Sequence, residues 1–207
     1  MSQAVRKSEA NRVLKPVIAT PESLKGYGWL IGEPDGKVRD KIDFYGREVQ
    51  VLQPAAFHGN DDLCLNLVTF TRRNFAVRWM EVHTKHTQTF IPLKGHPFIM
   101  VLGKPTRLRP DGTLDMSKAD LPNPDDVTAF LFDGSGGIVM DVGVWHEVPF
   151  PFEARTNFVC ICTNETNVNL EQQGADGECL GGDLDKKNIA KNFGYTFEID
   201  VTDIKHT

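Results

Sequence analysis

Short strand-like runs separated by turn residues are the feature that most constrains how this chain folds. Residues 63–70, LCLNLVTF, alternate, so Leu63, Leu65 and Leu67 lie on one face of a strand. Residues 97–103, PFIMVLG, are almost continuously apolar, as in a fully buried strand. The 18 glycines and 12 prolines supply many turns. The pattern predicts a mainly β protein with few short helices, either an antiparallel sandwich or a small barrel.

Composition narrows the class of protein further. The 207 residues suit one domain, and the net charge of −5 comes with scattered Lys and Arg, so we expect no nucleic-acid partner. Every apolar run falls short of the ~20 residues that span a membrane, and the N-terminus lacks the apolar core of a secretory signal. We therefore expect a cytoplasmic protein with no membrane partner. Reduced thiols are expected for all four cysteines: Cys64, Cys160, Cys162 and Cys179.

Composition also predicts the organisation of the chain. Residues 1–20 are expected to form a flexible N-terminal arm, and residues 21–168 hold the strand-like runs of the barrel. Residues 104–127 interrupt these runs with prolines and alternating charges. They predict a long surface loop, which either covers the mouth of the barrel or is a solvated insertion.

Residues 169–207 are expected to form a C-terminal extension that packs on the barrel or on a partner subunit. The extension begins as a polar, Gly-rich segment, and we expect a short helix near residues 183–192. Residues 193–199, FGYTFEI, alternate between apolar and other side chains. This alternation predicts either an added edge strand or a contact with a second subunit.

Two separate strand-like runs carry the residues best suited to chemistry. Glu81 and His83 lie two apart in FAVRWMEVH and therefore share a face; Gln88 begins the next run, and His146 follows far along the chain in GVWH. A small barrel would bring such distant strands together around its interior. Imidazole, carboxylate and amide oxygen can ligate a divalent metal, and the same groups can transfer protons near pH 7. The residue types alone leave both functions open.

Other candidate residues have simpler interpretations. Trp145 is either a packing residue or a wall of the pocket. Lys94 lies in a turn and would pair with a substrate carboxylate only if that turn folds over the barrel mouth. His86 does not share a strand face with His83 and is expected in the turn that follows. Ordinary surface or packing positions are expected for the remaining histidines: His58, His96 and His206.

Residues 81–95, in which Glu, His and Gln precede FIPLKG, resemble a block of the ureidoglycolate lyase family, a branch of the cupin superfamily. Residues 137–150, GIVMDVGVWHEVPF, resemble its second block, and TAFLFDGSGG resembles the strand and turn before it. The Tyr-Gly pair at Tyr27 resembles a pair near the family's N-terminus. The resemblance covers residues 21–168 and implies a cupin-type double-stranded β-helix, which is a jelly-roll barrel.

The resemblance also implies a modified metal cage. Glu81 and His83 stand where the first cupin motif has two histidines, Gln88 stands where it has Glu, and His146 matches the second motif. These four residues would hold a divalent metal if one is bound. Two changed donors should weaken affinity for soft or redox metals. The resemblance is equally consistent with a site that requires no cofactor.

The family splits ureidoglycolate, a small carboxylate, into glyoxylate and urea during allantoin breakdown, a part of purine metabolism. The resemblance implies Glu81, His83 and His146 as catalytic residues, with Glu81 and His83 sharing the acid–base work. It also implies a homodimer. The substrate contacts that follow from it are Gln88, Lys94, Trp145 and Tyr27.

The chain departs from the family after the second block. The family tends to show Asp-Phe and then Asp-Arg, whereas this chain has Asn157-Phe158 and Thr163-Asn164. A substrate carboxylate would therefore need another cation. Two alternatives remain open at this stage: a metal-dependent cupin isomerase or dioxygenase, and a non-catalytic cupin that binds a small acid.

Overall fold

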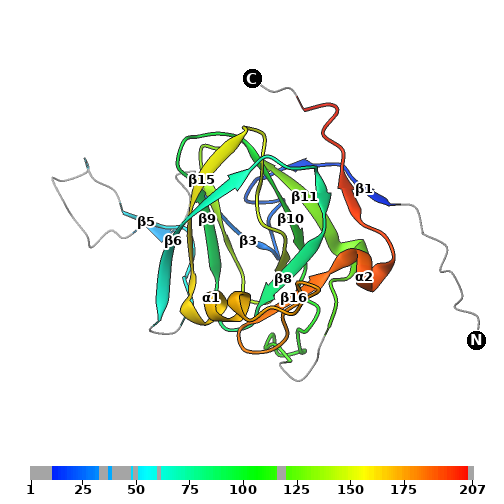
Figure 1. The fold of residues 1–207 in the computed structure, drawn as a ribbon. Coiled ribbons are helices and arrows are strands. Elements are labelled where there is room, and N and C mark those ends of the chain that lie inside the picture. The colour runs from blue at the N-terminus through cyan, green and yellow to red at the C-terminus, as the bar shows by residue number, and fades with distance from the viewer. Residues whose placement is uncertain are drawn as a thin grey trace, which may run out of the picture.

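Two β-sheets that face each other form the body of the protein (Figure 1). This computed structural model describes residues 11–32, 37–38, 48, 51–59, 62–115 and 120–204. The five-stranded sheet contains β3 (Gly28–Ile31), β6 (Leu63–Thr71), β9 (Gln88–Pro92), β12 (Gly137–Met140) and β15 (Arg155–Thr163). The seven-stranded sheet contains β2 (Val17–Ile18), β8 (Trp79–His83), β10 (Phe98–Gly103), β11 (Val127–Phe132), β13 (Trp145–His146), β14 (Phe150–Pro151) and β16 (Leu184–Asn188).

Smaller elements flank these sheets. A three-stranded sheet joins β1 (Arg12–Leu14), β7 (Ala76–Val77) and β17 (Phe197–Ile199), and β4 (Lys37–Val38) pairs with β5 (Leu52–Gln53). The helices are the 3₁₀ turn η1 (Pro124–Asp126), α1 (Asn164–Glu171) and α2 (Ile189–Phe193). No helix in the described part of the chain is both long enough and apolar enough to cross a membrane.

The strand order is that of a jelly roll. The seven-stranded sheet runs β16-β8-β13-β10-β11-β2, with β14 also paired to β10, and the five-stranded sheet runs β3-β12-β9-β15-β6. Consecutive strands such as β8, β9 and β10 therefore alternate between the sheets. The pairs within the two sheets are antiparallel, except that β2 joins β11 in parallel. The predicted mainly β fold, a jelly-roll barrel with few short helices, is confirmed.

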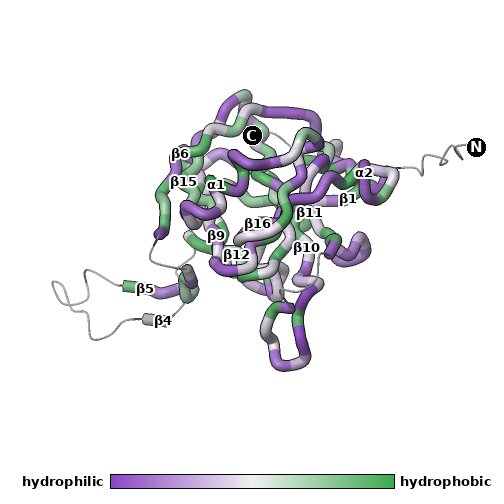
Figure 2. The backbone as a smooth tube through the Cα atoms, turned by 60° about the horizontal axis from the view of Figure 1, so that its bottom comes forward, coloured by the Kyte–Doolittle hydropathy of each residue, from purple (hydrophilic) through white to green (hydrophobic). Residues whose placement is uncertain are grey.

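Strand β10 is covered on both faces, which explains its continuous apolar sequence. Phe98 and Met100 enter the core between the sheets, where the Phe98 and Phe158 rings meet edge-on with centroids 5.0 Å apart. Ile99 and Val101 point the other way, into a second core. Strand β6 differs from β10, because hydrophobic and hydrophilic residues are mixed along it in Figure 2.

The second core is closed by the C-terminal segment of the same chain. Tyr195, Phe197 and Ile199 are buried in it. Strand β17 pairs with β1 on one side and β7 on the other, beside β8, β10 and β11 in Figure 1. Residues 193–199 thus include the central strand of a small sheet and not an edge strand, and the extension packs on the barrel. A contact with a second subunit there stays a prediction.

The two ends of the chain are more ordered than the sequence predicted. Residues 12–14 and 17–18 form β1 and β2, which pair with β17 and β11, so the expected flexible arm does not extend over them. Residues 1–10 lie outside the described residues, as does His206. The helix expected near residues 183–192 is a strand in its first half, and α2 begins only at Ile189.

The 104–127 segment is fixed to the barrel by side-chain contacts. Arg107 forms a buried ion pair with Asp185 of β16, and the indole N–H of Trp145 donates to Thr106 Oγ1 at 2.9 Å. Residues 116–119 of this segment lie outside the described residues. Thr106 and Arg107 thus anchor the start of the segment to β13 and β16, whereas residues 108–113 are exposed to solvent.

Candidate active site

Three of the predicted catalytic residues meet inside the barrel. Strand β8 presents Glu81 and His83 on one face, and β13 sets His146 directly opposite Glu81 in the antiparallel register. All three side chains are buried. One potential ligand atom from each lies within 4.8 Å of the other two. The fold therefore joins residues that are more than sixty positions apart in the sequence.

The contact between His146 and Glu81 requires a proton or a cation. His146 Nδ1 lies 3.2 Å from the Val144 carbonyl oxygen, which can only accept, so Nδ1 carries a hydrogen. His146 Nε2 lies 3.2 Å from Glu81 Oε1. A bare Nε2 would place its lone pair against an ionised carboxylate. The Glu81–His146 pair therefore holds either a shared proton or a bound cation.

The surroundings keep Glu81 ionised. Burial by itself raises the pKa of Glu81, because a low-dielectric site disfavours the charged form. The hydrogen bond and charge of His146 are the largest effects that oppose burial, Lys186 adds to them, and the net result is a lowered pKa of Glu81. Without a metal, Glu81 is thus the carboxylate that accepts the hydrogen bond from His146 Nε2.

His83 is a neutral imidazole beside this pair. Burial, followed by the charge of His146, lowers the pKa of His83 to about 3, although Glu81 acts in the opposite direction. The His83 and His146 ring centroids lie 5.2 Å apart. His83 Nε2 is buried and has no hydrogen-bond partner within the described part of the chain. The cluster therefore offers one proton acceptor and one proton donor.

A cavity of about 400 Å³ opens beside Glu81 and is lined by residues of β6, β8, β9, β15 and α1. Gln88, a predicted substrate contact, lines it, and its Oε1 is buried without a hydrogen-bond partner among the described residues. No Lys or Arg occurs among its described lining residues. Carboxylate, amide and hydroxyl groups reach it from Glu81, Asn66, Gln88, Asn167 and Thr166.

The donor set at this site fits a divalent metal ion. Glu81, His83 and His146 offer a carboxylate and two imidazoles within reach of one another, and such groups bind Zn²⁺ and similar ions. Buried polar atoms without partners, such as His83 Nε2 and Gln88 Oε1, need an explanation. A cation bound by these four residues would satisfy those atoms.

Two other predicted substrate contacts, Lys94 and Trp145, lie away from the cavity. Lys94 is exposed in the turn after β9, at the opposite end of that strand from Gln88. Trp145 neighbours His146 on β13 and therefore faces the opposite way, into the second core. The prediction that Lys94 and Trp145 contact substrate is not supported by these positions.

Tyr27 has a packing role in the inner core. Its ring meets the Phe130 ring edge-on with centroids 5.0 Å apart. Its hydroxyl donates to the Asp126 carbonyl oxygen at 3.1 Å. The side chain does not line the cavity, so its predicted substrate contact is not supported either.

Sequence reasoning missed two residues next to the site and underrated a third. His86, expected in an ordinary turn, is fully buried with its ring centroid 4.4 Å from that of His83. Its Nδ1 lies 2.5 Å from Asp183 Oδ2. Lys186 pairs with Glu81 across β16 and β8, so both lie on one side of the sheet. Asp183 and Lys186 stand in a polar segment without a recognisable motif, and no sequence signal marked them.

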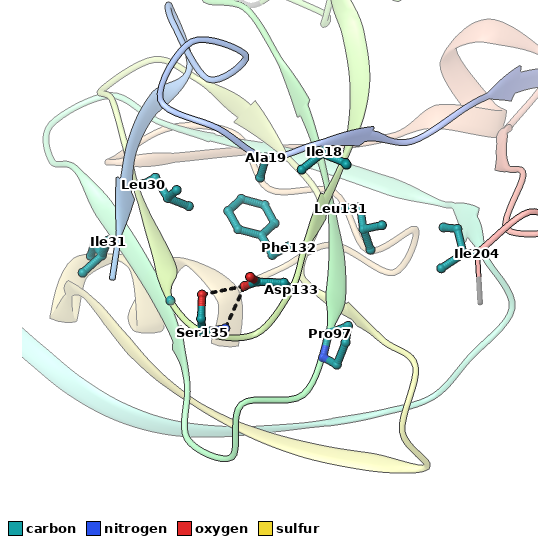
Figure 3. A pocket seen from close by; sticks show the side chains of 11 residues that line it. Ile18, Ala19, Leu30, Ile31, Pro97, Leu131, Phe132, Asp133, Ser135 and Ile204 are labelled. Atoms are coloured by element: carbon teal, nitrogen blue, oxygen red, sulfur yellow. Dashed lines mark hydrogen bonds between the residues drawn. The ribbon is translucent and has the colours of Figure 1, made fainter. Parts of the chain in front are cut away.

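A second cavity, of about 240 Å³, is separate from these residues (Figure 3). Its lining is mostly apolar and includes Ile18, Leu131 and Ile204. Its carboxylate, Asp133, already accepts hydrogen bonds from the backbone and the hydroxyl of Ser135. We therefore place the chemistry in the first cavity.

Comparisons of the sequence with a family model and with curated relatives point to one family. The model of the ureidoglycolate lyase family matches residues 11–179. A ureidoglycolate lyase of Azotobacter vinelandii is 34% identical over 106 residues, which cover 50% of this chain and 56% of that protein. One of Stutzerimonas stutzeri is 32% identical over 96 residues, 46% of this chain and 49% of that protein. The chain thus spans about half the length of the curated relatives it matches.

Among solved structures, RmlC from Streptococcus suis in complex with dTDP-D-xylose aligns with a TM-score of 0.30 and 12% identity. The alignment covers 50% of this chain and 44% of that one, and it adds nothing to the topology described above. The family match, in contrast, extends over nearly the whole barrel and includes Glu81, His83, Gln88 and His146. This chain belongs to the ureidoglycolate lyase family.

Proposed function

We propose that this protein is a carbon–nitrogen lyase that splits ureidoglycolate into glyoxylate and urea. The observation that carries the proposal is the neutral His83 beside the proton-holding Glu81–His146 pair, buried next to a cavity rich in amides. Membership of the family supports the same reaction. The reaction needs one base and one acid but no oxidant, and this cluster offers both groups.

The proton transfers follow from the charge states of the three residues. His83 Nε2 accepts the proton of the substrate hydroxyl, and the O–H electron pair forms the carbonyl of glyoxylate as the C–N bond breaks. The proton of the Glu81–His146 pair goes to the departing urea nitrogen. The proton gained by His83 returns to the pair before the next turnover, so atoms and charge balance.

The cavity lining suits a ureido group. Such a group presents N–H donors and one carbonyl acceptor, and side-chain amides offer both a donor and an acceptor. Asn66, Gln88 and Asn167 supply three amides around the cavity. We propose that they hold the ureido end of the substrate while its hydroxyl faces His83.

A divalent ion would be held by Glu81, His83, Gln88 and His146. When bound, it would act as a Lewis acid that polarises substrate oxygen atoms. The metal content of the purified protein, compared with that of a His146→Ala variant, tests whether these residues bind one.

Lys186, which lies beside Glu81 but does not line the cavity, is proposed as the cation that attracts the substrate carboxylate at long range. It lies across from Glu81, its charge contributes to the lowered pKa of Glu81, and its Nζ lies 3.1 Å from Gln173 Oε1. We expect Lys186→Met to raise KM for ureidoglycolate by about tenfold with little change in kcat, because this charge would bind ground and transition states alike. Lys94→Met is the matched control and should leave both constants unchanged. Equal effects of the two substitutions would contradict this role.

Product analysis tests the proposed reaction. Incubation of the purified protein with ureidoglycolate should release glyoxylate and urea in equal amounts. Ammonia in place of urea would show hydrolysis of the ureido group and would overturn the assignment as a lyase. A failure to consume ureidoglycolate at all would overturn the substrate.

We also propose a pathway, a cellular compartment and an oligomeric state for this protein. A place in allantoin breakdown follows from the substrate, and the four free cysteines support a reducing compartment such as the cytoplasm.

We propose a homodimer that uses the outer face of β6, where Leu63, Leu65 and Leu67 are exposed on one side as the alternation predicted. A monomeric mass at micromolar concentration would count against the dimer.

A further inference from the structure

Asp183 is a buried carboxylate that lies just before β16 and outside the residues matched by the family model. Its Oδ1 accepts hydrogen bonds from the backbone N–H groups of Thr84 and Lys85, at 3.2 and 2.8 Å. Burial raises the pKa of Asp183, but hydrogen bonds and the charge of His86 outweigh it, and the pKa is lowered overall. Asp183 is therefore an ionised group that can only accept hydrogen bonds.

The other oxygen of this carboxylate orders two hydroxyl groups. Thr163 Oγ1 donates to Asp183 Oδ2 at 2.8 Å, and Thr166 Oγ1 donates to the same oxygen at 3.2 Å. A hydroxyl has only one hydrogen to donate. Once the Thr166 hydrogen points at Asp183, a lone pair of Thr166 Oγ1 is left to face His83 Nδ1, which lies 3.4 Å away.

We infer that Asp183, acting through Thr166, fixes His83 as the tautomer that carries its hydrogen on Nδ1. The opposite tautomer would set the bare Nδ1 against a lone pair of Thr166, or would turn the Thr166 hydrogen away from the anion. With the hydrogen on Nδ1, the lone pair of His83 lies on Nε2, the buried atom that lacks a partner in the described structure. Thr166 and Asp183 are thus positioning residues, and His83 Nε2 is ready to accept a proton or to ligate a metal.

Tautomer and rate can be measured separately. Long-range ¹H–¹⁵N NMR on protein labelled at histidine nitrogens, with His83 assigned from a His83→Gln variant, should show hydrogen on Nδ1 and a bare Nε2. Thr166→Val, which removes the hydroxyl and keeps the shape, should give a mixture of tautomers. Thr166→Ser, which restores the hydroxyl, should return the wild-type spectrum.

The kinetic measurement rests on the proposed function, whereas the NMR measurement of the His83 tautomer does not. We expect Thr166→Val to lower kcat for ureidoglycolate by about tenfold, with KM nearly unchanged and rescue by Thr166→Ser. Hydrogen on Nε2 in the wild type, or an unchanged tautomer in Thr166→Val, would overturn the inference. If ureidoglycolate is not cleaved but the tautomer responds as expected, the proposed function fails and the positioning role stands.

Discussion

In a Glu81→Gln variant, kcat for ureidoglycolate cleavage is expected to fall by roughly 10²–10⁴-fold, the range typical for loss of a general acid or base. Gln is nearly the same size as Glu but carries no charge. It cannot act as the counter-ion of a protonated His146, whose Nε2 lies 3.2 Å from Glu81 Oε1. The site would then lose the proton that the departing urea nitrogen requires.

Steady-state kinetics and thermal unfolding of the same preparation check this expectation. Because the substitution nearly preserves shape, the unfolding temperature should change far less than kcat. Glu147→Gln is a useful comparison, because Glu147 is also a buried acid and its pKa is raised by burial, but it contacts Arg73 outside the cluster. A loss of rate in Glu147→Gln as large as in Glu81→Gln would show a general effect of buried acids and would contradict the assigned role.

Replacing Arg107 by Leu is expected to lower the free energy of unfolding by about 3–5 kcal/mol, the usual cost of leaving one charge of a buried pair alone. The side chains of Arg107 and Asp185 are only 5% and 7% exposed. Loss of the guanidinium would leave the Asp185 carboxylate buried, with the backbone N–H of Gly181 at 3.0 Å as its remaining donor among the described residues. The substitution would mainly destabilise strand β16, which pairs with β8.

Urea denaturation of matched variants tests this second expectation. Arg109 lies in the same loop and pairs with Asp115 at 3.3 Å, but its side chain is 51% exposed. We expect Arg109→Leu to cost less than about 1 kcal/mol. An Arg107→Leu, Asp185→Leu double variant should recover part of the stability, because it removes both charges. Equal costs for Arg107→Leu and Arg109→Leu would contradict a structural role for the buried pair.

The sequence predicted those features that depend on local periodicity. Alternation assigned Glu81 and His83 to one face of a strand, and the continuous run at residues 97–103 marked a doubly covered strand. Alternation gives the face of a strand but not its partner, which is why residues 193–199 were expected at an edge although β17 lies between two strands. Helix α1, NETNVNLE, was missed because it has almost no apolar side, and its start depends on the Thr163 cap.

Site residues were predictable only where a motif or a shared strand face marked them. Asp183 and Lys186 come to the site through the pairing of β16 with β8, a long-range contact that no local pattern encodes. Lys94 lies in the exposed turn after β9, at the opposite end of that strand from Gln88, and local periodicity does not show at which end of a strand the site lies. His86 was underrated because strand periodicity ends at His83, and the buried turn beyond is set by Asp183.

The most direct test of the central claim is glyoxylate release from ureidoglycolate by a Glu81→Gln, His146→Ala double variant. If the two residues act as one proton-holding pair, the double variant should be about as slow as Glu81→Gln alone, because the second substitution removes a partner whose function is already lost. Both rates should lie roughly 10²–10⁴-fold below the wild-type rate. Glyoxylate release that continues at the wild-type rate in the double variant would contradict the account of this site.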